Sequence, residues 1–127
     1  MSPLSKYLTE KEIEEYRTAA LLRQEKERRE ISKRRECGLQ VAAAAAKLLK
    51  DKFGATRVVV FGSVIRESCF TPWSDVDIAA WGILPEKFLS AIGEVKALDS
   101  NIAVNLVDMA VCKPSLKAVV EKEGYEL

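Results

Sequence analysis

The sequence contains no histidine and only three cysteines, Cys37, Cys69 and Cys112. Because histidine is missing, Ser-His-Asp and Cys-His catalysis are excluded, and Cys69 has no visible base that would activate it as a nucleophile. The wide spacing of the cysteines matches neither a zinc site nor a disulfide framework. A reducing cytoplasm is therefore the expected location.

Long apolar runs are also missing. The longest, Val41 to Ala46, is far shorter than the ~20 residues that a membrane-spanning helix needs, and the polar start of the chain has no signal-peptide core. A chain of 127 residues is long enough for one domain of ordinary size. We expect a soluble protein with one core and no membrane association.

Charge is nearly balanced over the whole chain but not along it. There are 20 basic and 19 acidic residues, so bulk charge gives no reason to expect nucleic-acid binding. Residues 1–54 contain 13 basic and 9 acidic side chains, a net charge of +4, whereas residues 55–127 contain 7 and 10, a net charge of −3. The sequence predicts an acidic domain that carries a basic arm.

The arm has the pattern of a charged helix. Thr9 and Glu12 have the spacing of a capping box, so a helix is expected to begin there. From Arg23 to Glu36 the only large apolar residue is Ile31, which means that this segment cannot bury a face. It is either a solvated helix or a contact surface for a partner or RNA, and self-association through it is a third interpretation.

Ion pairs within the helix support the solvated interpretation. Glu25 precedes Arg29 by four residues, and Glu30 precedes Arg34 by the same spacing. Such pairs stabilise an exposed helix by a few tenths of a kcal/mol each.

The rest of the chain alternates between helices and strands. Gly38 is expected to kink or end the charged helix, after which an apolar stripe predicts a core helix that ends at Gly54. A helix is predicted over residues 85–98, a turn at Asp99–Asn101, a strand over residues 102–109 and a last helix from Pro114 to Gly124. The inward side chains expected in the helix over residues 85–98 are Phe88, Leu89, Ile92, Val95 and Leu98.

Two strands in the middle of the chain carry the chemistry. Val58–Phe61 is a short β-branched and aromatic run that ends at Gly62, so a buried strand followed by a tight turn is predicted. Ser63 is expected to open a short helix through Glu67, whose N-terminal amides would hold a phosphate. The turn at Gly62 and Ser63 is thus a candidate anion site.

Asp75 and Asp77 follow after a loop. They alternate with Val76 and Ile78, and the period of two places both carboxylates on one face of a strand. Two neighbouring carboxylates repel each other unless a cation lies between them, and their hard oxygen ligands favour magnesium. A nucleotide triphosphate bound with Mg²⁺ is the chemistry that this pair predicts.

The whole pattern of strand, Gly62-Ser63, loop and Asp75-Val-Asp77 resembles the nucleotidyltransferase superfamily, and within it the minimal nucleotidyltransferases (MNT). The segments Val104–Met109 and Leu116–Tyr125 also resemble that family, so the similarity covers roughly Gln40 to Leu127. The resemblance implies an α/β (α+β) nucleotidyltransferase fold, with a small mixed sheet and helices packed on one face. It divides the chain into an N-terminal charged helical extension, residues 1–36, and an MNT domain, residues 37–127.

In this family, three carboxylates hold two metal ions, the third lying on the neighbouring strand. Here Ile102, Val104 and Leu106 form an apolar face, so Asn105 points to the side of the two aspartates and stands in the third place. Asp108 has the parity of the core face and is expected to end the strand or cap the turn that follows. Because an asparagine carries no charge and accepts no proton, catalytic activity is in question.

The loop between the two strands supplies further candidates. Arg66 either reaches the triphosphate or forms an ordinary ion pair with Glu67 or another acid, and Ser74 caps or positions Asp75. Trp73 either anchors the loop or stacks on a ligand. The predicted site thus has Asp75, Asp77 and Asn105 as catalytic residues, Asp75 and Asp77 as metal ligands, and nucleotide-binding residues Gly62, Ser63, Arg66 and Ser74.

The resemblance implies a Mg²⁺-dependent transfer of AMP from ATP to a hydroxyl of a protein partner. Many such proteins resemble the antitoxin of a toxin–antitoxin pair, whose partner is a small helical HEPN ribonuclease silenced by AMP added to a tyrosine. The alternative is a catalytically impaired nucleotidyltransferase fold that neutralises a partner by binding alone, and Asn105 supports it.

Overall fold

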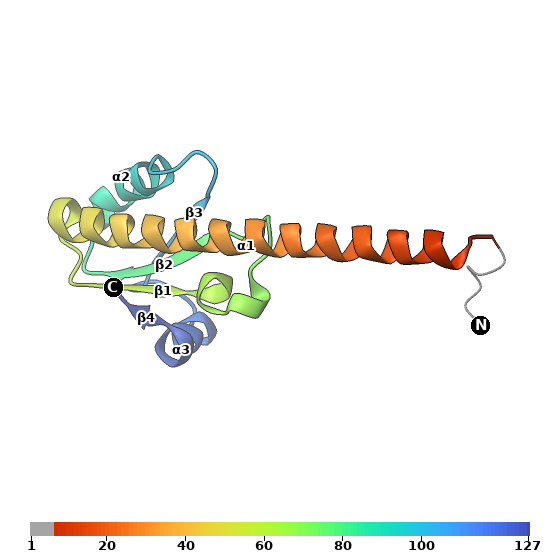
Figure 1. Ribbon diagram of the computed structural model, residues 1–127. Coiled ribbons are helices and arrows are strands. Elements are labelled where there is room, and N and C mark those ends of the chain that lie inside the picture. Colours follow the sequence, from red (N-terminus) through yellow and green to blue (C-terminus); the bar gives the residue numbers. More distant parts are fainter. Residues whose placement is uncertain (1–6) are drawn as a thin grey trace. The chain divides into compact units, whose positions relative to one another are not determined.

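The computed structural model describes residues 7–127, and contacts divide the described chain between Lys33 and Arg34. The predicted division between residues 36 and 37 stays a prediction. Along the chain, the elements labelled in Figure 1 and the two short 3₁₀ turns between β1 and β2 are α1 (Glu10–Phe53), β1 (Arg57–Phe61), η2 (Gly62–Ile65), η3 (Glu67–Cys69), β2 (Val76–Trp81), α2 (Pro85–Lys96), β3 (Val104–Asp108), α3 (Pro114–Glu123) and β4 (Tyr125–Glu126).

Helix α1 begins as predicted but does not stop at Gly38. The backbone N–H of Glu12 donates to the Thr9 hydroxyl over 3.1 Å, which confirms the capping interaction. A glycine inside a helix costs about 1 kcal/mol relative to alanine, and the alanine-rich segment that follows readily offsets this. Gly38 is buried within one continuous helix, which ends before Gly54 with its φ of +72°. The expected kink or end at Gly38 is therefore wrong.

The segment of α1 before Arg34 is almost entirely exposed, as the lack of an apolar stripe predicts. Tyr16 and Leu22 are each more than 60% exposed. The Glu25–Arg29 pair forms at 2.8 Å. The predicted Glu30–Arg34 pair is wrong, because Arg34 donates instead to the backbone carbonyls of Asn101 and Ser74.

Four strands form one mixed sheet in the order β3-β2-β1-β4. Strands β1 and β2 are antiparallel, and so are β1 and β4. Strands β2 and β3 are parallel, and α2 forms the crossover between them, as parallel neighbours require. Figure 1 shows the two central strands, which carry the Gly62 turn and the aspartates, side by side.

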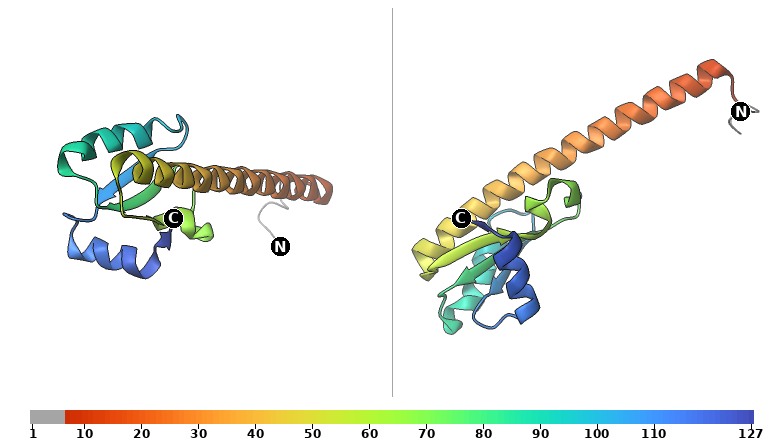
Figure 2. Two further views of the ribbon diagram at one scale, coloured as in Figure 1. Left: turned by 90° about the vertical axis from the view of Figure 1, so that its left-hand side faces the viewer. Right: turned by 90° about the horizontal axis from the view of Figure 1, so that it is seen from below.

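Different helices pack on the two faces of the sheet. On the first, Val60, Val76 and the other fully buried residues of that parity lie under α2 and the part of α1 after Arg34, where Gly38 lies against Val76. On the second face, Val59 packs with Val120 of α3. Figure 2 (left) shows α2 and α3 on opposite sides of the sheet. The predicted fold class is confirmed, but α3 departs from the expected packing of all helices on one face.

Both helices bury only a short apolar stripe. In α2 the buried residues are Ala91 and Val95, and Leu89 is 80% exposed, so its predicted inward position is wrong. In α3 only Val120 is buried, with Leu116 partly so, which is enough to cover part of the second face. The rest of that face stays open.

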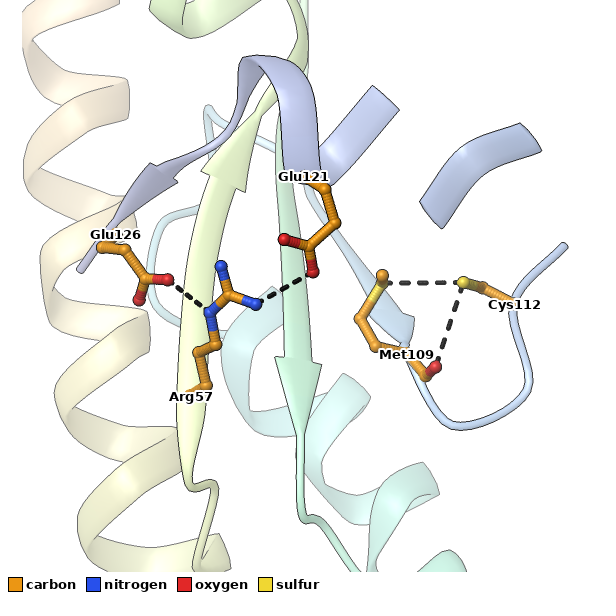
Figure 3. A network of polar contacts seen from close by, with 5 residues as sticks. All are labelled: Arg57, Met109, Cys112, Glu121 and Glu126. Carbon is orange, nitrogen blue, oxygen red and sulfur yellow. Dashed lines mark hydrogen bonds and ion pairs between the residues drawn. The ribbon is translucent and has the colours of Figure 1, made fainter. Parts of the chain in front are cut away.

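The last residues pair with the sheet as β4, an edge strand too short to be recognised in the sequence. Arg57 forms ion pairs with Glu126 of β4 and with Glu121 of α3 (Figure 3). Its guanidinium also lies 4.3 Å from the centre of the Trp81 ring. These contacts fasten the C-terminal segment to β1. None of the helices within residues 7–127 combines the length and hydrophobicity needed to cross a bilayer.

Two glycines should respond oppositely to the same substitution. A Cβ on Gly124 would lie 2.3 Å from Val59 Cγ1 and 2.4 Å from the Val120 carbonyl oxygen, whereas a Cβ on Gly93 would meet nothing within 4 Å. Gly124→Ala should therefore lower the free energy of unfolding by about 1–3 kcal/mol, and Gly93→Ala should raise it by about 0.5–1 kcal/mol. Urea unfolding measures both; equal effects would contradict this packing.

Candidate functional site

The two aspartates and Asn105 meet at one end of the open face. Asp77 on β2 lies directly opposite Asn105 on β3 in the parallel register. The Asn105 side-chain N–H₂ donates to Asp75 Oδ2 over 3.3 Å and to Asp77 Oδ1 over 3.1 Å. The predicted face of Asn105 is confirmed, and one neutral amide connects both carboxylates.

The environment of Asp77 disfavours its negative charge. Burial raises the pKa of this carboxyl above its ordinary value of 3.8, and the nearby charge of Asp75 acts in the same direction, while the hydrogen bond from Asn105 lowers the pKa and offsets part of the effect. Asp77 is half-buried, whereas Asn105 is exposed. A cation bound here would therefore stabilise the negative charge of the two carboxylates.

The turn after β1 lies against this pair. Gly62 has a φ of +81°, and a Cβ built on it would lie 2.5 Å from Asp77 Oδ2. Only glycine allows the backbone to approach the carboxylate this closely. Gly62 and its neighbour Ser63 therefore lie at the same end of the sheet as Asp75 and Asp77.

The short helix expected from Ser63 through Glu67 forms only in part, as 3₁₀ helix and with a break. The chain forms two 3₁₀ turns, η2 and η3, interrupted at Arg66, whose backbone is extended. Such short turns do not build the aligned dipole of an α-helix. Any anion held here would depend on the Gly62 turn itself.

The loop residues are placed around the site but not all at it. The exposed Arg66 forms an ion pair with Glu123 over 3.7 Å, so its role in triphosphate binding stays a prediction. The Ser74 hydroxyl accepts from the Thr71 backbone N–H over 2.9 Å and thereby closes the turn that leads into Asp75. Ser74 thus stabilises the loop that precedes Asp75.

Asp108 lies away from the pair. It pairs in register with Ala80, on the other parity of the sheet, and its carboxylate accepts from the Ala110 backbone N–H over 3.0 Å. The predicted cap of the turn before the last helix is confirmed. Asn105 is therefore the residue that stands in the third position.

A groove of about 580 Å³ opens beside Asp75 and Asn105, on the β3 side of the site. Trp73 lies on its rim with 85% of its surface exposed, and Lys96 contributes a positive charge. Gly62 follows β1 on the other side of β2. The carboxylates thus lie between a turn on one side and an open groove on the other.

The sequence did not single out Arg34 and Arg35, although both reach this region. Arg34 donates to the carbonyl oxygens of Ser74 and Asn101, and Arg35 donates to that of Val64. In the sequence they belong to a run of charges that looks uniformly exposed. The one signal in the sequence is Gly38, three residues after Arg35, because a glycine within a helix allows another element to pack closely against it.

The donor atoms fit one hard divalent cation. Within residues 7–127, no three His, Cys, Asp or Glu side chains come together as a metal cluster. Asp75 and Asp77 supply two carboxylates, and a half-turn of the Asn105 amide would add its oxygen as a neutral ligand. Oxygen donors of this kind suit Mg²⁺.

The raised pKa of Asp77 predicts how stability depends on pH in metal-free protein. Below pH 3.8 the carboxyl is protonated in both states. As pH rises, the unfolded chain loses this proton first, so the folded state becomes relatively less stable until its own pKa is passed. Asp77→Asn removes this loss and should gain stability over the wild type between pH 3.8 and neutrality.

Urea unfolding in the presence of EDTA at a series of pH values measures this difference. Asp51→Asn, at an exposed position of α1, controls for the loss of one negative charge. A difference that is constant with pH, or that falls as pH rises, would contradict the raised pKa.

Comparisons with known proteins support the fold. No family profile matches the sequence, and a comparison with curated proteins finds no significant relative. Among solved structures, a mutant MntA–HepT toxin–antitoxin complex contains a similar chain, with a TM-score of 0.56, 24% identity, and coverage of 67% of this chain and 69% of that one.

Two more solved structures agree with it. A tri-AMPylated HEPN toxin of Shewanella oneidensis in complex with its MNT antitoxin matches with a TM-score of 0.53, 20% identity and coverage of 70% of each chain. A toxin–antitoxin complex with AMP-PNP matches with a TM-score of 0.54, 22% identity, and coverage of 64% and 67%. The chain thus has the minimal nucleotidyltransferase fold found in these complexes.

Proposed function

We propose that this protein transfers AMP from Mg-ATP to a hydroxyl of a protein partner, a small helical toxin of the HEPN type, and so acts as an antitoxin in the cytoplasm. The observation that carries the proposal is the joining of Asp75 and Asp77 through Asn105, with Asp77 against the Gly62 turn. The similar structures include one with AMP-PNP and one with an AMPylated toxin, which supports this chemistry.

Each part of the site has a distinct task in the reaction. Asp75 and Asp77 would hold Mg²⁺, which would supply the positive charge that neutralises the phosphates of the nucleotide. The Gly62-Ser63 turn holds the phosphates. The acceptor oxygen forms a bond to the α-phosphorus, the bond to the bridging oxygen breaks, and pyrophosphate leaves.

Asn105 sets the speed of this step. A carboxylate at this position would accept the proton that the acceptor hydroxyl loses, but the amide has no basic atom, so the proton passes to solvent. Asn105 also adds no negative charge for a second cation. We therefore expect slow transfer and retained nucleotide binding.

The second candidate is an antitoxin that neutralises its partner by binding alone. It is favoured by the amide of Asn105 beside the two carboxylates, because an amide supplies neither a base for the acceptor hydroxyl nor a charge for a second cation. In this case the exposed segment of α1 before Arg34 is a candidate contact surface, and self-association through it stays a further alternative.

Transfer of label from ATP distinguishes the two candidates. The protein is purified with the helical partner that it captures from its own cells, then incubated with Mg²⁺ and ATP labelled at the α-phosphate. We expect label on the partner with the wild type and none with Asp75→Asn combined with Asp77→Asn. A captured partner without label in either sample would favour the binding-only antitoxin.

Substitution of the third position tests the role of Asn105. Asn105→Asp supplies the missing base and charge, and the transfer rate should rise by roughly a hundredfold or more, given the usual contribution of a general base. Gln40→Glu, at an exposed position of α1, adds the same charge away from the site and should leave the rate unchanged. A slower Asn105→Asp enzyme would mean that the amide itself is needed.

A further inference from the structure

Arg34 lies within hydrogen-bond reach of both loops that lead into the carboxylate site. Its Nη1 donates to the carbonyl oxygen of Asn101 over 2.9 Å, and its Nη2 donates to that of Ser74 over 3.3 Å. Ser74 directly precedes Asp75, and Asn101 lies in the loop that enters β3, the strand of Asn105. One guanidinium thus connects the two segments whose spacing fixes the distance between Asp75 and Asn105.

The next residue of α1 makes the equivalent contact on the other side of the site. Arg35 Nε donates to the carbonyl oxygen of Val64 over 2.7 Å. Val64 follows Ser63 in the turn that lies beside Asp77. Two consecutive arginines of α1 therefore contact the turn after Gly62, here called the phosphate turn, and the loop that ends at Ser74.

Close packing of the helix makes this reach possible. Gly38 lies one turn after Arg34, and a Cβ on it would come within 3.2 Å of Val76 Cγ2 and 3.4 Å of Val64 Cγ2. Val76, the first residue of β2, lies between Asp75 and Asp77 in the sequence. The helix is thus seated directly on the strand and the turn that build the site.

Burial of the Arg34 side chain lowers the stability of the fold. Its Nε is buried and has no hydrogen-bond partner among the described residues. An unpaired buried donor is destabilising, and a well-packed apolar side chain at this position would avoid the penalty. The arrangement of the site is a better reason for an arginine here than stability.

We propose that Arg34 and Arg35 are positioning residues that set the geometry of the metal–nucleotide site, Arg34 for the aspartates and Arg35 for the phosphate turn. This inference rests on the proposed function. The planar guanidinium of Arg34 donates to two carbonyls at fixed angles, which the single ammonium of a lysine does not reproduce. Charge alone is therefore insufficient at this position.

Substitution by lysine separates geometry from charge. The affinity for Mn²⁺ with α,β-methylene-ATP, measured by electron paramagnetic resonance, should fall about tenfold in Arg34→Lys, as it does when outer partners of metal ligands are changed. In Arg35→Lys we expect weaker binding of the nucleotide, with Mn²⁺ affinity in the absence of nucleotide unchanged.

Two control variants of α1 exclude trivial causes. Arg29→Lys makes the same substitution at an exposed position, and Ala46→Gly destabilises the buried part of the same helix away from the site. Both should bind Mn²⁺ and the nucleotide as the wild type does. A loss of affinity in Ala46→Gly equal to that in Arg34→Lys would reduce Arg34 to an ordinary structural residue and overturn the inference.

The outcomes for the inference and for the proposed function are distinct. Wild-type binding with unchanged affinity in Arg34→Lys overturns the positioning role and leaves the proposed function standing. A wild-type protein that binds neither Mn²⁺ nor the nucleotide analogue overturns both.

Discussion

Burial of the Asp77 carboxylate, with repulsion from Asp75 acting in the same direction, is the constraint on which the site depends. The period of a strand places them on one face, and the partly buried position of Asp77 raises the cost of its charge. The Asn105 amide relieves this repulsion by donating to both groups. The amide thus holds the two carboxylates in place and leaves oxygen ligands that a cation can use.

The surrounding elements hold that arrangement from two directions. Gly62 brings the turn after β1 against Asp77, and its φ of +81° would strain a residue with a side chain. From the first face of the sheet, α1 passes over Val76 with Gly38 in contact and extends its arginines to the loops. The helix that carries the basic arm is thus also part of the scaffold of the site.

Local chemistry in the sequence predicted much of this structure. The Gly62 turn, the Asp75–Asp77 pair and the facing position of Asn105 follow from glycine conformation and from the two-residue period of strands. What the sequence missed depends on tertiary packing. The sequence does not show that the helix continues through Gly38 or that α3 packs on the second face. Nor does it show the contacts of Arg34 and Arg35, because neighbouring arginines of one helix look alike until the surface that the helix packs on is known.

The identity of the third residue distinguishes this site from one with three carboxylates. Three carboxylates would demand cations for stability, whereas two carboxylates and an amide tolerate their absence. The two proposed functions, slow transfer and binding alone, differ in whether a cation is needed at this site. The balance between the two depends on whether Mg²⁺ and nucleotide actually occupy the site.

A crystal structure of the protein with Mn²⁺ and α,β-methylene-ATP tests most directly whether a metal ion and a nucleotide occupy the site. The anomalous signal of manganese locates the cation independently. We predict manganese bound by Asp75 and Asp77, with the phosphates at the Gly62-Ser63 turn. Nucleotide bound elsewhere, or a crystal grown in excess ligand that shows no manganese at the two aspartates, would contradict a nucleotide–metal site at this end of the sheet.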